Sequence, residues 1–158
     1  SKNYQKFKLF KSMPLIIILF LSLPYEILHS MDEYFLTLRN DKVNLRQGPS
    51  FDYPVKIFYK KKFLPVLIQD QSDNFRKVRD HENNTGWIHI SQLSKKKAAI
   101  TIDNDLIVFD KPSVYSRPLV LLKKGRLCKI QKCKKEWCKV KIDSFSGWIK
   151  RNSLWGLL

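Results

Sequence analysis

The chain has 158 residues, with 30 lysines and arginines against 14 aspartates and glutamates, which gives a formal net charge of +16. Its length allows one ordinary domain or two very small ones. With 44% hydrophobic and 13% aromatic residues it can build a core, and this composition excludes wholesale disorder. The charge favours association with polyanions such as nucleic acid, anionic lipid head groups or acidic wall polymers, although solvated surface lysines give the same composition.

The first thirty residues are typical of an export signal. Four lysines precede an apolar run over 13–23, and the run is shorter than the roughly 20 residues that a membrane span needs. Pro24 ends the run, and we expect cleavage after Ser30, although Leu28 is larger than the residue preferred three positions earlier. Alternatively, residues 1–30 are not cleaved and anchor the protein in the membrane, which is the only membrane association that the sequence predicts. The sequence therefore predicts a signal peptide over 1–30 and a basic periplasmic or secreted protein.

Two copies of one pattern follow this segment. A Pro-Ser pair occurs at 49–50 and again at 112–113, and a Gly-Trp-Ile triplet occurs at 86–88 and again at 147–149. The landmarks keep their order and nearly the same separation, so short deletions in loops reconcile the copies. We infer a duplication. The predicted domains are a signal peptide over 1–30, a first barrel over 34–95 and a second barrel over 98–158.

Short strands are predicted throughout both copies. Apolar and polar residues alternate at period two, the pattern of half-buried strands. This alternation occurs at Val43/Leu45, Val66/Ile68 and Cys138/Val140/Ile142. Turn residues separate these runs, and no stretch after residue 35 has the periodicity of an amphipathic helix. The pattern indicates an all-β chain of two small antiparallel barrels in tandem, with the exposed basic run 95–97 as their linker.

Segments of both copies match a known family pattern. The segment Val43-Asn44-Leu45-Arg46-Gln47-Gly48-Pro49-Ser50, followed later by 86–88, resembles the bacterial SH3 (SH3b) family. The end of the second copy, 137–140 and 147–156, resembles SH3-like proteins that many alphaproteobacteria export. The resemblance covers nearly all of residues 34–158 and implies two tandem small SH3-like β-barrels. The second copy departs at 110–113, which lacks the arginine and glycine of the opening motif.

The glycines of these motifs are expected to shape turns. Gly48 can take a positive φ before proline fixes the next φ, which predicts a sharp turn out of the first strand. Gly86 and Gly147 are expected to let the chain turn tightly, so that the tryptophan after each packs in a core. Trp155 is expected to close the bottom of the second barrel.

All three cysteines lie in the second copy. Cys133 and Cys138 bracket an apparent hairpin turn, and facing strands would bring their side chains together. In an exported chain this arrangement predicts a Cys133–Cys138 disulfide, with Cys128 buried and free. Structural zinc needs four ligands with closely paired cysteines, and the histidines lie elsewhere in the sequence. No metal and no cofactor are therefore predicted.

Catalysis is not predicted either, although domains of this kind often accompany cell-wall hydrolases. A cysteine peptidase needs a histidine and a fold that brings it to the thiolate, and two barrels leave no residues to build one. A glycosidase needs two carboxylates in a cleft, whereas the acidic residues here are scattered in loops. The sequence contains no Gly-rich phosphate loop and no Gly-x-Ser-x-Gly motif.

The leading interpretation is an exported, non-enzymatic binding module for cell-wall (peptidoglycan) material or an envelope protein, with no small-molecule substrate. SH3-type barrels present shallow aromatic grooves to extended chains. The candidate ligand-binding residues are Phe51, Tyr53, Tyr59, Tyr115 and Arg46, although loop anchoring is the stronger expectation for the arginine. One alternative is a nucleic-acid or other polyanion binder that uses the basic surface, against which the export signal argues. Another is an envelope scaffold.

Overall fold

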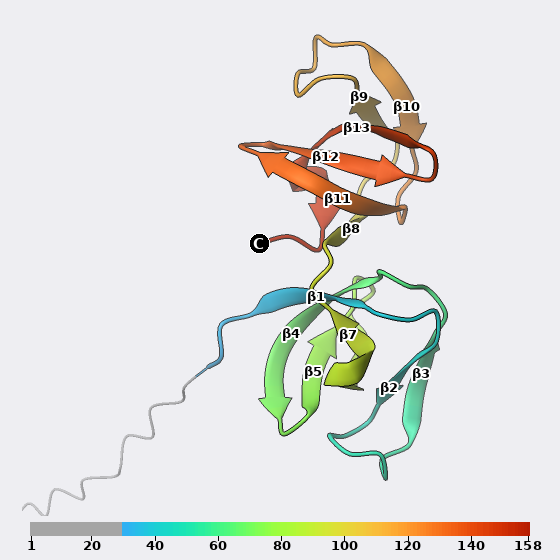
Figure 1. The fold of residues 1–158 in the computed structure, drawn as a ribbon, viewed down its shortest axis with the longest axis vertical. Helices are drawn as coiled ribbons and strands as arrows, with labels where there is room; N and C mark the ends of the chain where they lie inside the picture. The colour runs from blue at the N-terminus through green and yellow to red at the C-terminus, as the bar shows by residue number, and fades with distance from the viewer. Residues whose placement is uncertain (1–29) are drawn as a thin grey trace, which may run out of the picture.

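A computed structural model describes residues 30–158, and in it the chain forms two antiparallel sheets with only two short 3-10 helices (Figure 1). The predicted signal peptide lies outside the described residues except for its last residue, Ser30. Within the described part of the chain, no helix is long and apolar enough to cross a bilayer. The expectation of an antiparallel all-β architecture is confirmed.

The first sheet has seven strands in the order β3-β2-β6-β5-β4-β1-β7. Its elements are β1 (Tyr34–Leu38), β2 (Val43–Arg46), β3 (Val55–Tyr59), β4 (Pro65–Ser72), β5 (Phe75–Arg79), β6 (Thr85–His89), the 3-10 helix η1 (Ile90–Gln92) and β7 (Leu93–Ser94). Period-two alternation explains β2 and β6 locally. In β2, for example, Val43 and Leu45 are buried while Asn44 and Arg46 are half-buried, because successive side chains point to opposite faces.

The second sheet repeats the first strand for strand, in the order β10-β9-β13-β12-β11-β8-β14. Its elements are β8 (Ala98–Thr101), β9 (Leu106–Phe109), β10 (Pro118–Leu122), β11 (Leu127–Lys134), β12 (Trp137–Ile142), β13 (Phe145–Lys150), the 3-10 helix η2 (Arg151–Ser153) and β14 (Leu154–Trp155). Even a local irregularity recurs: the ladder shifts between Ile68 and Asp70 in β4, and between Ile130 and Lys132 in β11. The tandem repeat is therefore a property of the fold, and the two sheets are called the first and second repeat below.

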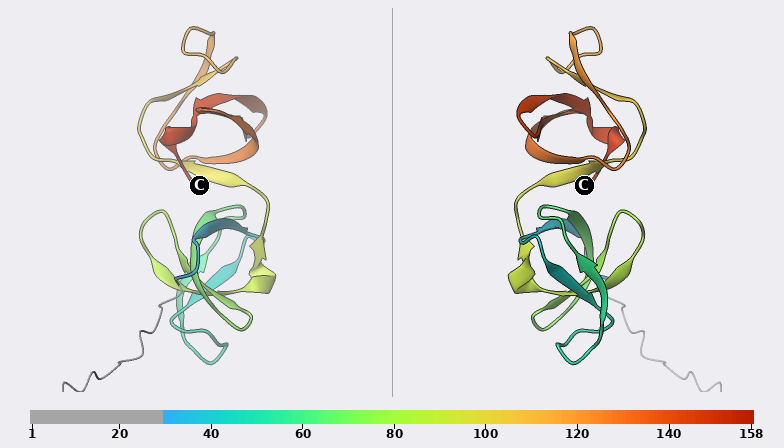
Figure 2. Two further views of the ribbon diagram at one scale, coloured as in Figure 1. Left: turned by 90° about the vertical axis from the view of Figure 1, so that its left-hand side faces the viewer. Right: turned by 90° about the vertical axis from the view of Figure 1, so that its right-hand side faces the viewer.

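The hydrogen bonding differs in one respect from the closed barrels expected from the sequence. Within residues 30–158, the outermost strands of each order (β3 and β7, β10 and β14) do not pair with each other. The strands β7 and β14 have only two residues each, and they are used in pairing with β1 and β8. Each repeat is consequently an open, curled sheet, as the two side views show (Figure 2).

Each sheet curls around a core of its own. The first core contains Leu38, Val43, Leu45, Tyr59, Leu64, Val66, Ile68, Val78, Ile88, Leu93 and Ile100. The second core contains Ala99, Val108, Leu122, Cys128, Cys138, Val140, Ile142, Ile149 and Leu154. Trp148 is 8% exposed, in agreement with a core position, whereas Trp87 is only half-buried.

The glycines of the Gly-Trp-Ile triplets act differently from the expectation. Gly86 and Gly147 lie inside strands β6 and β13 rather than in turns. A Cβ on Gly86 would lie 2.7 Å from the carbonyl oxygen of Arg46, and one on Gly147 would lie 2.9 Å from that of Phe109. These glycines therefore allow a close approach of β6 to β2 and of β13 to β9, which a side chain would block.

The two repeats pack against each other. Ile100 of β8 belongs to the first core, and Leu127 of β11 packs against it. Trp155 was expected to close the second barrel from below. Its ring instead lies edge-on to Phe35 of β1 at 4.9 Å, because β14 runs beside β8 at the junction. The chain passes between the sheets at residues 95–97, which lie between β7 and β8.

Candidate functional site

The loop between β2 and β3 carries the first candidate surface. Arg46, the last residue of β2, donates hydrogen bonds to the carbonyl oxygens of Phe51 at 3.1 Å and Tyr53 at 2.9 Å. The arginine thus anchors the loop, as expected. Gly48 does not have the positive φ that was expected of it. A glycine is required there for another reason: a Cβ would lie 2.5 Å from the Tyr53 ring. Gly48 is needed because the tyrosine ring covers its Cα.

This anchored loop presents an aromatic cluster. Phe51 is 65% exposed, and its ring centroid lies 5.2 Å from that of Phe75 and 5.1 Å from that of His89. The Arg46 guanidinium lies 5.3 Å from the centroid of Phe51, within the range of a cation–π contact. Phe75 and His89 are direct partners across β5 and β6. We call Arg46, Phe51, Phe75 and His89 the first aromatic surface, in which Phe75, only 6% exposed, supports the exposed Phe51.

Tyr59 does not belong to this surface. It is 9% exposed, and its hydroxyl donates to Oδ2 of the buried Asp80 at 2.8 Å. Burial, together with this hydrogen bond, raises the pKa of Tyr59 well above its usual value. The candidate role in ligand binding is therefore corrected to a structural one, because the last residue of β3 faces the core.

The second repeat has a smaller cluster at the equivalent place. Phe109 and Trp137 meet edge-on at 5.7 Å, and the Lys150 ammonium lies 5.8 Å from the centroid of Trp137. Trp137 and Lys150 are cross-strand partners, as Phe75 and His89 are in the first repeat. Phe109, Trp137 and Lys150 form the second aromatic surface.

Tyr115 lies apart from this cluster. It is 96% exposed on the loop between β9 and β10, and only its backbone amide is held, by Ser113 Oγ at 3.2 Å. The structure thus brings together Phe51 and Arg46 of the predicted set, with Tyr53 beside them, and leaves Tyr115 outside. It adds Phe75, His89 and the second surface, which the sequence interpretation missed. Strand pairing gives the signal for these residues. The strands that contain the Gly-Trp-Ile triplets end at His89 and Lys150, and each of these two residues pairs with an aromatic residue of the neighbouring strand.

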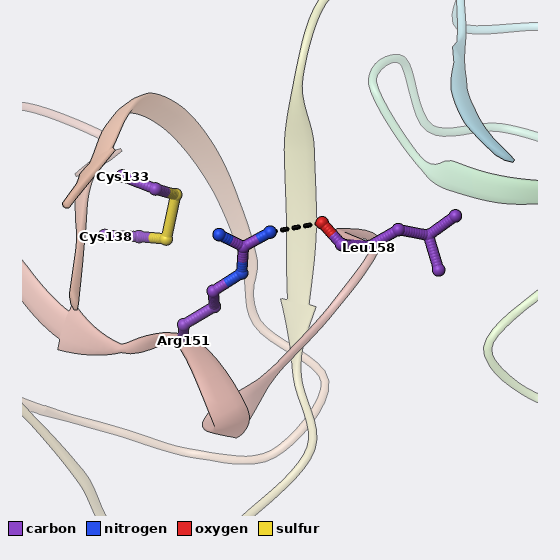
Figure 3. Close-up of a disulfide and its surroundings, with 4 residues drawn as sticks. All are labelled: Cys133, Cys138, Arg151 and Leu158. Carbon is purple, nitrogen blue, oxygen red and sulfur yellow. Dashed lines mark hydrogen bonds between the residues drawn. A yellow bond between two sulfur atoms is a disulfide. The ribbon is translucent and has the colours of Figure 1, made fainter. Parts of the chain in front are cut away.

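The predicted disulfide is present in the second repeat. Cys133 and Cys138 are direct cross-strand partners, with Cα atoms 4.0 Å apart (Figure 3). Cys128 is buried and free, as expected, and burial raises the pKa of its thiol to about 12. In the described part of the chain, no three His, Cys, Asp or Glu side chains come close enough together to hold a metal ion.

Comparison with solved structures finds weak similarity to three proteins. NlpC2 from Trichomonas vaginalis is 13% identical, with a TM-score of 0.36 over 78% of this chain and 48% of that one. NlpC1 from the same organism is 13% identical, with a TM-score of 0.35 over 78% and 46%. An NLPC/P60 family protein from Bacillus cereus ATCC 10987 is 11% identical, with a TM-score of 0.36 over 77% and 55%. The chain spans about half the length of these proteins.

Comparison with curated proteins finds no match. The model of the family described as "Bacterial SH3 domain" matches twice, over residues 39–95 and 103–156. The two matches fall on the two sheets and include both Gly-Trp-Ile triplets. Together they cover most of the sequence, and the chain therefore belongs to the bacterial SH3 domain family.

Proposed function

We propose that this protein is an exported, non-catalytic binding module that holds acidic cell-wall material on its aromatic surfaces. The observation that carries the proposal is the exposed Phe51, which Arg46 fixes against Phe75 and His89. A rigid aromatic face of this kind offers stacking area to sugar rings or extended peptides at little entropic cost. The recurrence of an aromatic cluster at the same place in the second repeat supports two contacts along one polymer.

Charge and redox chemistry support the class of ligand and the compartment. The formal net charge is +16, and it is +13 without residues 1–30, which contain four lysines and one glutamate. Either charge attracts acidic polymers. A structural disulfide such as Cys133–Cys138 is expected in an oxidising compartment, which agrees with the basic and apolar pattern of residues 1–30. We thus propose that the protein is exported and has no catalytic activity of its own.

Sedimentation with purified peptidoglycan sacculi tests this function. We expect the purified chain to pellet with the sacculi at low and moderate salt. Phe51→Ala should weaken binding about five- to tenfold, the worth of one good aromatic contact. Phe58→Ala is the matched control, because Phe58 is similarly exposed at 67% but lies on β3 outside the cluster; it should change binding less than about twofold. Tyr53→Ala is a poorer probe, since it also uncovers Gly48.

Two results would contradict the proposal. Protein that stays in the supernatant at both salt concentrations does not bind the wall. Binding that disappears steeply with salt and is equal for wild type and Phe51→Ala indicates a general polyanion contact, the nucleic-acid-type alternative, since aromatic stacking is far less sensitive to salt.

A further inference from the structure

A cleft lies at the junction of the two repeats, and its lining includes no residue of either aromatic surface. Its volume is about 620 Å³, within the range of about 300–1,000 Å³ that ligand pockets occupy. The walls come from β1, the segment 95–97, β11 and residues 156–158. In two views the C-terminal end lies between the sheets at this place (Figures 1 and 2).

The cleft is strongly cationic. Its charged lining residues are Lys95, Lys96, Lys97, Lys132 and Arg151, and no lining residue is acidic. The four lysines are exposed. The arginine already donates a hydrogen bond to the main-chain oxygen of Leu158 (Figure 3). Cations gathered with no acidic side chain among them favour an anionic ligand.

The floor of the cleft is apolar. The hydrophobic lining residues that are half-buried are Phe35, Leu36, Ile130 and Leu157. Leu36 packs in part against the first core, and Ile130 and Leu157 pack in part against the second. A free anion such as phosphate would leave the remaining exposed area of these side chains in water. A chain that carries both apolar and acidic side chains would use the floor and the cations together.

One wall of the cleft is also a free strand edge. β1 pairs with β4 from Tyr34 to Thr37, but β7 pairs with β1 only at Thr37 and Leu38. The Leu38 amide donates to Leu64 of the β4 side, so alternation directs the N–H and C=O of Phe35 away from β4. This peptide edge is available to an added strand.

The junction is packed, so the cleft is formed before a ligand arrives. Trp155 contacts Phe35, and Ile100 lies in the first core. Gly156 approaches so closely that a Cβ there would lie 2.7 Å from the Ala98 carbonyl oxygen and 2.9 Å from Pro65. A preformed site spares a ligand the free energy of ordering it.

We propose that this cleft binds an extended acidic peptide of a partner protein, which adds to the edge of β1 at Phe35. Successive side chains of the added strand point to opposite sides, so apolar side chains meet the floor while the carboxylates between them meet the lysines. A nucleic acid or a glycan would meet the cations but leave the peptide edge unpaired, which favours a peptide. This site is independent of sacculus binding by the aromatic surfaces.

Fluorescence anisotropy with the full chain tests the proposal. The probe is a fluorescein-labelled hexapeptide of alternating valine and glutamate, compared with the same peptide containing lysine in place of glutamate. We expect the acidic peptide alone to bind. The double variant Lys97→Glu/Lys132→Glu should weaken its binding by at least about tenfold. Lys42→Glu/Lys111→Glu, with two exposed lysines outside the cleft, is the matched control for net charge and should change the affinity less than about threefold.

Strand addition has its own test. Two forms of the acidic peptide, N-methylated on alternate residues in opposite registers, should differ in affinity. The form whose N-methyl groups replace the donors that face β1 should lose binding by at least about tenfold, and the other form should bind as the unmodified peptide does. Phe51→Ala should bind the peptide as wild type does. Equal affinity of the N-methylated peptides, an unchanged affinity of the cleft variant with a native circular dichroism spectrum, or stronger competition by a single-stranded DNA oligonucleotide would each overturn the proposal.

Discussion

The two repeats share a strand order, but one equivalent pair of core positions is polar in the first repeat and apolar in the second. In the first repeat, Tyr59 at the end of β3 hydrogen-bonds to Asp80, and both are buried. In the second, Leu122 ends β10 and Ile142 ends β12, and both belong to the core. One fold thus accepts a buried polar pair and a buried apolar pair at the same place.

The polar pair serves the turn that follows it. Asp80 Oδ1 accepts hydrogen bonds from the backbone amides of Glu82 at 2.9 Å and Asn84 at 2.8 Å, so the carboxylate organises the turn between β5 and β6. In the second repeat β12 and β13 are joined by only Asp143 and Ser144, and no buried carboxylate is needed. The length of the local turn, rather than the sheet, therefore determines whether these core positions are polar.

Replacing Asp80 should have the largest effect on this comparison. In Asp80→Asn the amide group faces the Asn84 side-chain amide and no longer accepts from Tyr59, so two charge-assisted hydrogen bonds are lost. We expect a loss of about 3 kcal/mol in the free energy of unfolding, measured by urea denaturation. Asp143→Asn is the matched control, because Asp143 is exposed and asparagine tolerates its positive φ of 50°. It removes only the solvent-exposed ion pair with Arg126 and should cost less than about 0.5 kcal/mol. Equal losses would show that the buried carboxylate has no special role.

The sequence predicts much of this fold because its signals are local. Period-two alternation marks β2 and β12, and the repeated Gly-Trp-Ile triplet marks the equivalent strands β6 and β13. The alternation predicted at Val66/Ile68 is wrong for β4, because Leu67 between them is buried as well. The disulfide follows from cysteines on both sides of a short turn. These features depend on neighbours in sequence, so they can be read without coordinates.

The candidate sites were harder to predict because they depend on contacts between distant segments. Phe51 meets His89 only after β2, β5 and β6 have paired, and Trp155 contacts β1 only after the repeats have packed. Tyr59 shows the same limit from the other side: it lies near exposed aromatic residues in sequence, but strand parity directs it to the core. Composition cannot distinguish these positions.

The disulfide is the next difference between the repeats. Gln71 and Arg76 of the first repeat are paired in the same register as Cys133 and Cys138, without a covalent link. Removing the bridge in Cys133→Ala/Cys138→Ala should lower the free energy of unfolding by about 2 kcal/mol, because the cross-link restricts a short loop of the unfolded chain. Urea denaturation measures the loss.

The reciprocal change is the control for register. Gln71→Cys/Arg76→Cys should form a second disulfide spontaneously in air, since cross-strand partners of this kind place their Cβ atoms close enough for the two sulfur atoms to bond. Thiol titration of the denatured protein should then find the Cys128 thiol alone. Free thiols from the grafted pair would show that the two hairpins are not equivalent.

Cys128 offers the smallest and most selective test. It is buried in β11 as Val66 is in β4, so Cys128→Val should change stability at pH 7 by less than about 1 kcal/mol. Burial raises the pKa of the folded thiol from 9.0 to about 12, so the folded state holds this proton more tightly than the unfolded state does. The stability that the protonated thiol contributes is full below about pH 9 and decreases as the pH rises towards 12, with a slope approaching about 1.4 kcal/mol per pH unit. Between pH 8 and pH 10, the free energy of unfolding of the wild type, measured by urea denaturation, should therefore fall by about 1 kcal/mol more than that of the valine variant. Equal decreases in the two proteins would mean that the thiol is solvated in the folded protein.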